Sequence, residues 1–461
     1  MLERWFELSR RRTTVGAEVR GGLTTFMVMA YIIFVNPAIL SFAGIPPLAG
    51  QGPSFAATQA VTCLVAGAMT IAMGLATNYP LAIASGMGIN AVVAFQLVAA
   101  LKLPWTAAMG VVLLEGLAIT VLVLTGFREA IMHAIPVSLK RAIGVGIGLF
   151  ILFIGLGAAG IVKPGPPGVP VTLGDLTAAP VAVALFGLLL TVWLTARRSS
   201  GALLVGILVS TGLAIAVNAG TGGRAFPIPG QAVWPAALVA MPDFSSLGAG
   251  FDFSVFVRLG LITALVTIFS LMLSDFFDTM GTVIGIGGEA GWLTPDGRLP
   301  RLNRVLLVDS LAAVAGGAAG ASSATTYIES AAGVAAGART GLASVVTGAC
   351  FLLALFFAPL AGVVPAQATA PALIVVGYLM SRVVREIPFD DFEEGFPALL
   401  TLTMMAFTYS ISNGIGAGFV SYCVIKLVRG KGATVPAMMY AAAVAFVIYF
   451  VLPLVQRLLA A

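Results

Sequence analysis

The chain has 461 residues, of which 59% are hydrophobic and only 9% charged, and its formal net charge is +5. Soluble domains carry roughly 25% charged residues, so this composition excludes an ordinary soluble protein. Apolar runs of about 20 residues recur along the chain, each long enough to cross a hydrocarbon layer of about 30 Å as a helix, and they lack the alternating pattern of membrane strands. The predicted fold class is therefore an all-α polytopic membrane protein.

The amino-terminal segment "MLERWFELSRRRTTVGAEVRGG" is polar and basic and leads straight into the first apolar run. No cleavable signal peptide is recognisable in it, so we expect a multi-pass protein of the plasma or inner membrane with a cytoplasmic amino terminus. The three cysteines, Cys63, Cys350 and Cys423, lie inside apolar runs without a paired spacing. They predict neither a disulfide framework nor a thiolate metal site.

The apolar runs predict fourteen membrane spans in two sets of seven. They lie near residues 22–42, 54–77, 82–100, 104–126, 139–161, 179–196 and 201–219, and near residues 257–286, 305–320, 324–338, 341–362, 366–385, 396–410 and 412–428. With a cytoplasmic start, every basic cluster falls on an inside loop, as the positive-inside rule requires. The chain then divides into a first repeat (1–219), an extracytoplasmic loop (220–255), a second repeat (256–430) and an apolar segment (431–461) whose topology stays open.

An odd number of spans in each half implies that the two repeats are inverted in the membrane. Secondary transporters of this kind place the substrate near the midplane, where short or glycine-interrupted spans occupy corresponding positions in the two halves. The third span of each half fits this description, with "YPLAIASGMGINAVVAF" at 79–95 and "GASSATTYIESAAGV" at 320–334. We therefore predict that the substrate site lies where these two segments meet.

Carboxylates inside the predicted spans are the second indication of a transport site. An ionised side chain at the bilayer centre costs roughly 2.5 to 3.5 kcal/mol, so such groups normally face a cavity or a partner. The predicted spans contain Glu115, Asp275, Asp278, Asp309 and Glu329. For Glu115 and Asp309 a structural role is the favoured interpretation, because Asp309 lies near the start of a span and Glu115 has few small neighbours.

Asp275, Asp278 and Thr282 are spaced i, i+3, i+7 in "SDFFDTMGT", which places them on one stripe of a helix that can line a cavity. The alternative for Asp278 is a carboxylate that caps the amides of a broken helix or pairs with Arg339. Asp275 is equally compatible with both roles.

Glu329 follows Thr325, Thr326 and Tyr327 in a stretch of small residues where the backbone can unwind, so we predict contact with substrate or proton. Asn90 offers a donor and an acceptor on one planar amide, which suits the edge of a planar heterocycle. Its alternative role is a hydrogen bond between helices.

The sequence contains no HExxH, GxSxG or GKS/T motif and no soluble domain large enough for ATP, so an enzyme and a primary pump are not expected. No motif supports a cofactor, a metal ion or nucleic acid as a partner. His133, the single histidine, lies in a predicted loop, so any coupling proton would be carried by a carboxylate.

These residues resemble the adenine/guanine/hypoxanthine permease branch of the nucleobase-cation symporter-2 (nucleobase/ascorbate transporter) family. The similarity runs over essentially the whole chain and includes "GGLTTFMVMAYIIFVNPAIL", "ASGMGINAVVAF", "SDFFDTMGTVIGI", "TTYIESAAGVAAGARTGL" and "MMAFTYSISNGIGAGFVSY". It departs from the family pattern at Ser85, Val92 and residues 321–324, and Val92 and Ala324 are expected to alter the walls of the pocket.

The resemblance implies fourteen spans in two inverted repeats, with a core domain (spans 1–4 and 8–11), a gate domain (spans 5–7 and 12–14) and extended pieces in spans 3 and 10. It implies proton-coupled import of purine bases, and a homodimer by analogy. A sodium-coupled symporter and an anion transporter or channel on the same fold are the alternatives. The candidate substrate-binding residues are Asn90, Asp278, Glu329, Thr326, Tyr327 and Gly88, and the candidate proton-coupling residues are Asp278, Asp275 and Glu329.

Overall fold

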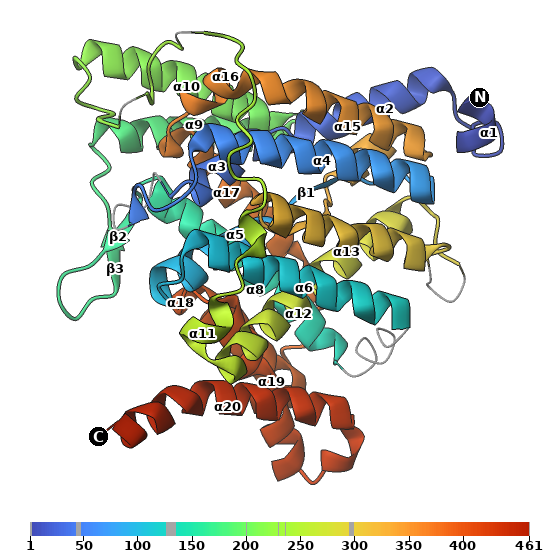
Figure 1. The fold of residues 1–461 in the computed structure, drawn as a ribbon, viewed down its shortest axis with the longest axis vertical. Coiled ribbons are helices and arrows are strands. Elements are labelled where there is room, and N and C mark those ends of the chain that lie inside the picture. Colours follow the sequence, from blue (N-terminus) through green and yellow to red (C-terminus); the bar gives the residue numbers. More distant parts are fainter. Residues whose placement is uncertain are drawn as a thin grey trace.

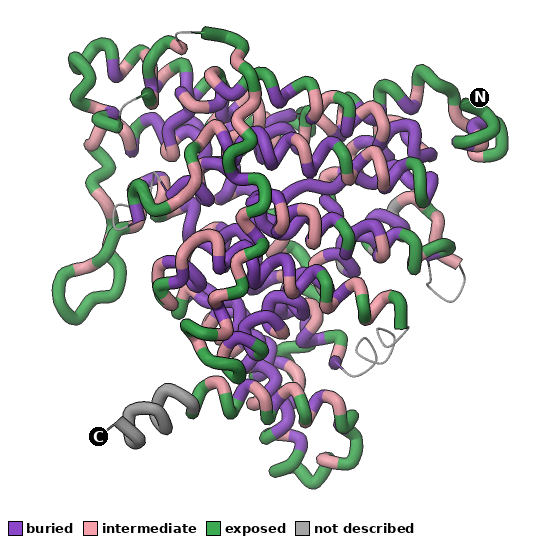
Figure 2. The backbone as a smooth tube through the Cα atoms, viewed as in Figure 1, coloured by how far each residue is buried: buried purple, intermediate pink, exposed green. Residues whose placement is uncertain are grey.

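The computed structural model describes residues 2–42, 48–125, 135–199, 201–228, 230–235, 237–294 and 299–460. His133 lies outside the described residues. Helices make up most of the chain, as predicted, and they are stacked across the view in Figure 1 with the two termini at opposite sides. The interior of this stack is buried and its ends and outer helices are exposed (Figure 2).

The amino-terminal half is a series of apolar helices interrupted once by a strand. Its elements are α1 (Leu2–Phe6), α2 (Val15–Met29), α3 (Ile32–Leu40), α4 (Phe55–Thr77), β1 (Ile83–Ser85), α5 (Met87–Ala91), the π-helix η2 (Val92–Ala100), α6 (Trp105–Thr125), α8 (Val137–Ala158), α9 (Ala179–Ala196) and α10 (Ala202–Gly220). The strands β2 (Val162–Pro164) and β3 (Val171–Leu173) form a hairpin between α8 and α9.

The carboxyl-terminal half is likewise a series of helices interrupted once by a strand. Its main elements are α11 (Val255–Leu259), α12 (Leu261–Glu289), α13 (Leu302–Ala319), β4 (Ala324–Thr326), α14 (Ser330–Ala335), α15 (Gly341–Ala354), α16 (Ala358–Gly362), α17 (Ala366–Ser381), α18 (Phe392–Phe407), α19 (Ile411–Val428) and α20 (Ala437–Ala460). The short helices η3 (Ala249–Phe251), η4 (Leu355–Phe357), η5 (Arg382–Glu386) and η6 (Gly432–Thr434) lie between them.

Eleven stretches of the described residues are long and apolar enough to cross a membrane. They correspond to all but three of the fourteen predicted spans, namely the third, the tenth and the thirteenth. The third and tenth spans are each broken into a strand and a short helix, and α18 in the thirteenth has only 16 residues. The chain is therefore a multi-pass helical protein, and the difference in count comes from the two broken segments and the short helix α18.

The helix contacts fall mainly into two groups. In the first, α4 packs against α15 and α3, and α6 packs against α13 and α12. In the second, α8 packs against α17 and α18, α9 packs against α10 and α17, and α18 packs against α19. Fewer contacts join the groups, chiefly those of α12 with α8 and α19 and of α5 with α8.

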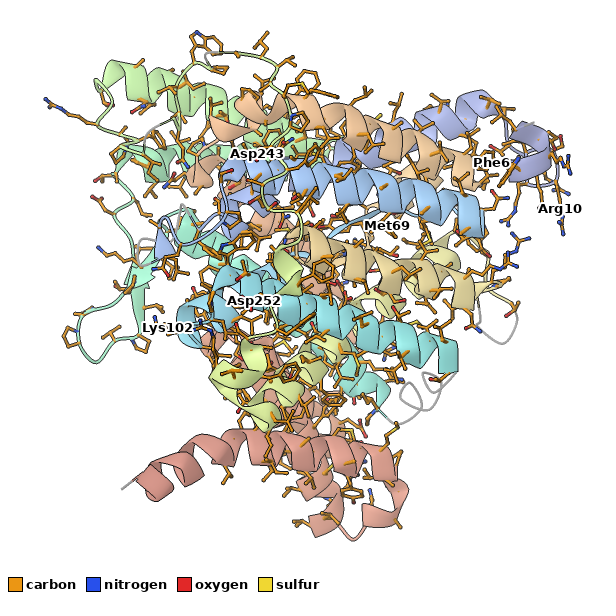
Figure 3. The ribbon with its side chains drawn as sticks, in the orientation of Figure 1. Phe6, Arg10, Met69, Lys102, Asp243 and Asp252 are labelled. Atoms are coloured by element: carbon orange, nitrogen blue, oxygen red, sulfur yellow. The ribbon has the colours of Figure 1, made fainter. Side chains whose placement is uncertain are left out.

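The predicted extracytoplasmic loop is fixed to the starts of two helices. Ser54, at the amino end of α4, donates to Asp243 at 3.0 Å, and Thr106 of α6 donates to Asp252 at 2.6 Å. The same hydroxyl and the Ser254 amide hold the pKa of Asp252 below its ordinary value. Figure 3 shows Asp243 and Asp252 along the segment that crosses these helices.

A buried acid joins α18 to the end of α19. The Glu393 side chain is only 3% exposed and accepts from Lys426 at 2.7 Å, Lys431 at 2.6 Å and Arg429 at 3.3 Å. Lys426 and Lys431 lower the pKa of Glu393 to about 2. The helices α18 and α19 therefore form a hairpin whose two charged ends lie together.

We expect Glu393→Gln to lower the melting temperature of the purified protein by an amount that is constant between about pH 5 and 8. Because the pKa of Glu393 is lower in the folded than in the unfolded protein, ionised Glu393 stabilises the fold. This stabilisation is complete above the ordinary pKa of 4.5 and is lost as the pH falls toward 2. The measurement is thermal unfolding in detergent across pH, with Glu386→Gln as the control, since Glu386 pairs with Arg141 on the surface. A wild-type advantage that varies between pH 6 and 8 would contradict this assignment.

Candidate functional site

The centre of the fold is a two-stranded antiparallel sheet made by the two broken spans. Ile83 pairs with Thr326, Ala84 with Thr325 and Ser85 with Ala324. All six residues are buried, which is tolerated in an apolar interior because each strand satisfies backbone groups of the other. The extended pieces expected in these two segments are thus present. β1 leads into the helix that carries Gly88 and Asn90, and Glu329 follows β4.

Asp309 on α13 holds β4 in place. Its Oδ1 accepts from the amide and the hydroxyl of Thr326, each at 2.7 Å, and its Oδ2 accepts from Thr279 at 2.6 Å. Thr279 of α12 also shares a hydrogen bond with Thr325 at 2.6 Å. The structural role predicted for Asp309 fits these bonds, and they engage both the amide and the hydroxyl of Thr326.

Asn36 and Ser85 hold β1 from the other side. The Asn36 amide donates to Thr62 at 2.6 Å and to Ser85 at 3.1 Å, and the Ser85 hydroxyl donates to the Ala321 carbonyl at 2.7 Å. Ser85 is one of the positions that depart from the family pattern. Its hydroxyl joins the two broken segments directly.

Glu329 is the residue before α14 and is half-buried, beside the exposed Ile328. Its Oε1 accepts from the Tyr31 hydroxyl at 2.9 Å. Tyr327 is buried and donates its own hydroxyl to the Ser85 carbonyl. Tyr31 therefore orients the Glu329 carboxyl group, and Tyr327 ties the start of α14 to β1.

Asp278 on α12 is half-buried and lies within electrostatic reach of Glu329 and Asp309. Among the described residues no side chain hydrogen-bonds to it. The alternative pairing with Arg339 does not occur, because the Arg339 guanidinium donates to the carbonyls of Val334 and Ala338. Asp275, one turn earlier, is 1% exposed and accepts from Ser323 at 3.1 Å.

Asn90 and Gly88 lie on the short helix after β1. Asn90 is fully buried, and its Oδ1 has no hydrogen-bond partner among the described residues. A Cβ at Gly88 would lie 2.8 Å from Ile147 of α8 and 3.7 Å from Ile411 of α19. Gly88 is thus a contact between the two helix groups, and a direct role in substrate binding stays a prediction for both residues.

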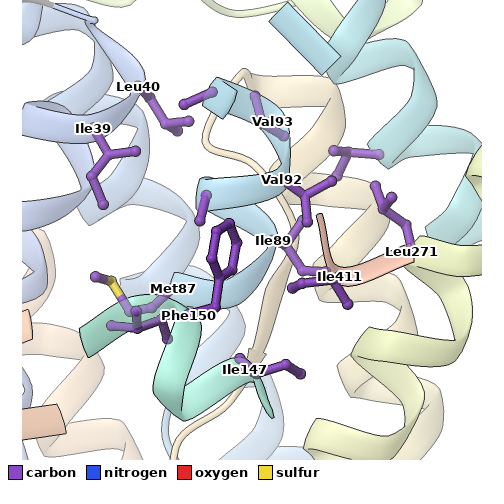
Figure 4. Packing of buried hydrophobic residues seen from close by; sticks show 14 of the residues in the cluster. Ile39, Leu40, Met87, Ile89, Val92, Val93, Ile147, Phe150, Leu271 and Ile411 are labelled. Carbon is purple, nitrogen blue, oxygen red and sulfur yellow. The ribbon is translucent and has the colours of Figure 1, made fainter. Parts of the chain in front are cut away.

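Val92 lies within the apolar core rather than on an open wall. It is 1% exposed, and Figure 4 shows it beside Ile89, Ile411 and Leu271. Ala324, the second position expected to shape the pocket, is fully buried in β4. Neither side chain is exposed, and an effect of either on the walls of the pocket stays a prediction.

A polar contact between the two helix groups lies in η2, toward the carboxyl end of the broken third span. The Gln96 amide of η2 donates to Ser412 at 3.1 Å and accepts from Ser410 at 3.0 Å. All three side chains are buried. Neutral hydrogen bonds therefore attach the broken third span to the start of α19.

The sequence reasoning missed Tyr31 and Asn36 as residues of this site. Both lie in the first apolar span, where a phenol and an amide are unusual, and that is the signal that was available. Nothing in the spacing of that span indicates that its polar residues meet Glu329 and β1.

Comparison with known proteins gives a consistent picture. Residues 16–417 match the model described as Permease family. The chain is 41% identical over 455 residues to the guanine/hypoxanthine permease PbuG of Bacillus subtilis, covering 98% of this chain and 99% of that protein. It is 40% identical over 431 residues to the adenine permease AdeP of Escherichia coli, covering 94% of this chain and 92% of that protein.

Among solved structures, the transmembrane domain of the cyanobacterial bicarbonate transporter BicA superposes with a TM-score of 0.60 at 16% identity, covering 87% of this chain and 96% of that domain. At this identity the likeness concerns the fold alone.

We expect Asp309→Ala to destabilise the protein, because the buried Thr326 amide would lose its acceptor at a cost of roughly 1–3 kcal/mol. Asp309→Asn is the matched control, since an amide keeps the shape and one acceptor oxygen. Thermal unfolding in detergent should rank wild type above Asp309→Asn and Asp309→Asn above Asp309→Ala. Equal melting temperatures for the three proteins would remove Asp309 as the anchor of β4.

Proposed function

The chain belongs to the Permease family, and from this premise we propose that it imports purine nucleobases together with protons by alternating access. A member of this family is a transporter and not an enzyme. The relatives named as guanine/hypoxanthine and adenine permeases support a purine as the substrate. The proposed location is the plasma or inner membrane, with a cytoplasmic amino terminus.

The observation that carries this proposal is the pair of half-buried carboxyl groups, Asp278 and Glu329, beside the central sheet. A purine presents ring N–H donors and acceptors on its edge and a stacking surface on its faces. The carboxylates accept from the donors, and the free oxygen of Asn90 is a further acceptor. The aromatic ring of Tyr327 is available to cover one face of the base.

The two carboxyl groups differ in their surroundings. Glu329 accepts from the Tyr31 hydroxyl, which stabilises its ionised form and fixes its direction. Asp278 lacks such a donor among the described residues and lies close to two other carboxyl groups. We therefore assign base recognition to Glu329 and the proton to Asp278, with Asp275 behind it on the same helix stripe.

Alternating access requires two bodies that move past the substrate. The two helix groups fit the proposed core domain, with α2 to α6 and α12 to α15, and the proposed gate domain, with α8 to α10 and α17 to α19. Gly88 and Gln96 lie where these groups meet. Movement at this boundary would expose the site to each side of the membrane in turn.

The test is uptake of radiolabelled hypoxanthine into liposomes under an inside-alkaline pH gradient in sodium-free buffer. Accumulation that collapses with a protonophore, and that adenine or guanine inhibits but uracil does not, is the expected result. Uptake that needs sodium would overturn the proton assignment. Silence under both gradients would overturn the purine assignment.

We expect Asp278→Asn to abolish uphill uptake while leaving weak exchange of hypoxanthine across the membrane. The amide keeps the size of the side chain but cannot carry a proton, so net transport loses its coupling. Full proton-driven uptake by this variant would refute the role of Asp278.

We expect Tyr31→Phe to raise the KM for hypoxanthine about tenfold, because a hydrogen bond to a charged group contributes about 1.5–3 kcal/mol. The matched control is Tyr378→Phe, since Tyr378 lies exposed on α17. An unchanged KM in the Tyr31 variant would mean that Glu329 is oriented without the phenol.

A further inference from the structure

A second group of carboxyls lies on α6, α12 and α13. Glu115 of α6 is fully buried, and neither of its carboxyl oxygens has a hydrogen-bond partner among the described residues. Oδ1 of the buried Asp275 also lacks a partner. The function proposed above gives no role to Glu115.

The groups that face Glu115 come from three elements. Asp275 faces it from α12, Asp309 from α13, and the Ser323 hydroxyl from the turn before β4. The helix α6, which carries Glu115, packs against both α12 and α13, so these three helices enclose the group. Within the described part of the chain, neither Glu115 nor Asp275 takes part in an ion pair.

Hydrogen bonding separates Asp309 from the other two groups. Asp309 accepts three bonds from Thr326 and Thr279, which is a suitable environment for a permanent negative charge. The Ser323 hydroxyl has a single proton and donates it to Asp275, and although it lies close to Glu115 it forms no hydrogen bond with either Glu115 oxygen. Two unpaired ionised carboxylates in one solvent-free space would cost several kcal/mol for each ion.

We propose that Glu115 and Asp275 form a proton-binding pair, separate from the carboxyls that contact substrate, which loads and releases one proton in each transport cycle. The proton on Glu115 would bond to the free oxygen of Asp275, which satisfies an unpartnered atom on each side. Asp278, to which the proposed function assigns the proton, lies one turn along α12 and is half-buried, so it would pass the proton to and from this pair. The inference rests on the proposed proton symport and adds the buried site that exchanges the proton with Asp278.

The occupant is a proton and not a metal ion. Among the described residues no group of three or more acidic, histidine or cysteine side chains could hold a metal. The two carboxyls and one hydroxyl do not by themselves supply the roughly six to eight oxygens of a calcium site, whereas a shared proton needs only one donor and one acceptor oxygen.

The experiment compares wild type, Glu115→Gln and Asp275→Asn in liposomes, with Thr120→Val as an isosteric control on the same helix. Hypoxanthine exchange at equal pH needs no net proton movement and reports that the protein is folded. With one coupled proton, a gradient of about one pH unit supports a concentration ratio of about ten. We expect Glu115→Gln to keep exchange within about threefold but to lower this ratio to about one, whereas Thr120→Val keeps both.

The outcomes separate this inference from the proposed function. Proton-driven accumulation by wild type together with unchanged accumulation by Glu115→Gln would overturn the pair and leave the symport intact. Sodium-driven uptake by wild type would overturn both. If Glu115→Gln does not fold, infrared difference spectra of wild type and Asp275→Asn decide. The proposal requires a protonated-carboxyl band that changes when the pH changes and that differs between the two proteins, and identical spectra would overturn it.

Discussion

The antiparallel pairing of β1 with β4 is the interaction on which the rest of the site depends. A membrane interior offers no water to satisfy a broken helix, so a span that unwinds must find partners for its backbone groups inside the protein. Here two segments from opposite halves of the sequence unwind and satisfy each other through Ile83–Ser85 and Ala324–Thr326. Neither half can form this centre alone, and Asn90 and Glu329, which we propose as substrate-binding residues, follow the two strands.

The polar side chains around the sheet follow from this constraint. Asp309 replaces the acceptor that the Thr326 amide would have in an unbroken helix, while Asn36 and Ser85 join the outer edge of β1 to the turn before β4. These residues fix the backbone. Glu329 and Asp278 remain half-buried and less constrained, so their carboxyl groups are available for chemistry.

The sequence predicted the elements of this arrangement better than their contacts. Glycine and small polar residues identified the two broken spans, because a lipid-facing helix would carry Leu there. The spacing of Asp275 and Asp278 placed them on one face of their own helix. Which distant helix faces them is decided by tertiary packing, so the Tyr31 bond to Glu329 and the approach of Glu115 to Asp275 were not predictable from periodicity. The span count differed because two broken segments and the short helix α18 keep an apolar composition without the helical length of a full span.

The bonds of Gln96 with Ser410 and Ser412 would have to break if the two helix groups moved apart at this boundary. An amide and two hydroxyls carry no net charge, so dissolved ions barely screen their attraction. Water that enters the boundary can replace each of these bonds at little net cost. In the proposed movement of the two helix groups, hydration of this boundary would therefore govern how long these bonds persist, and ionic strength would have little effect.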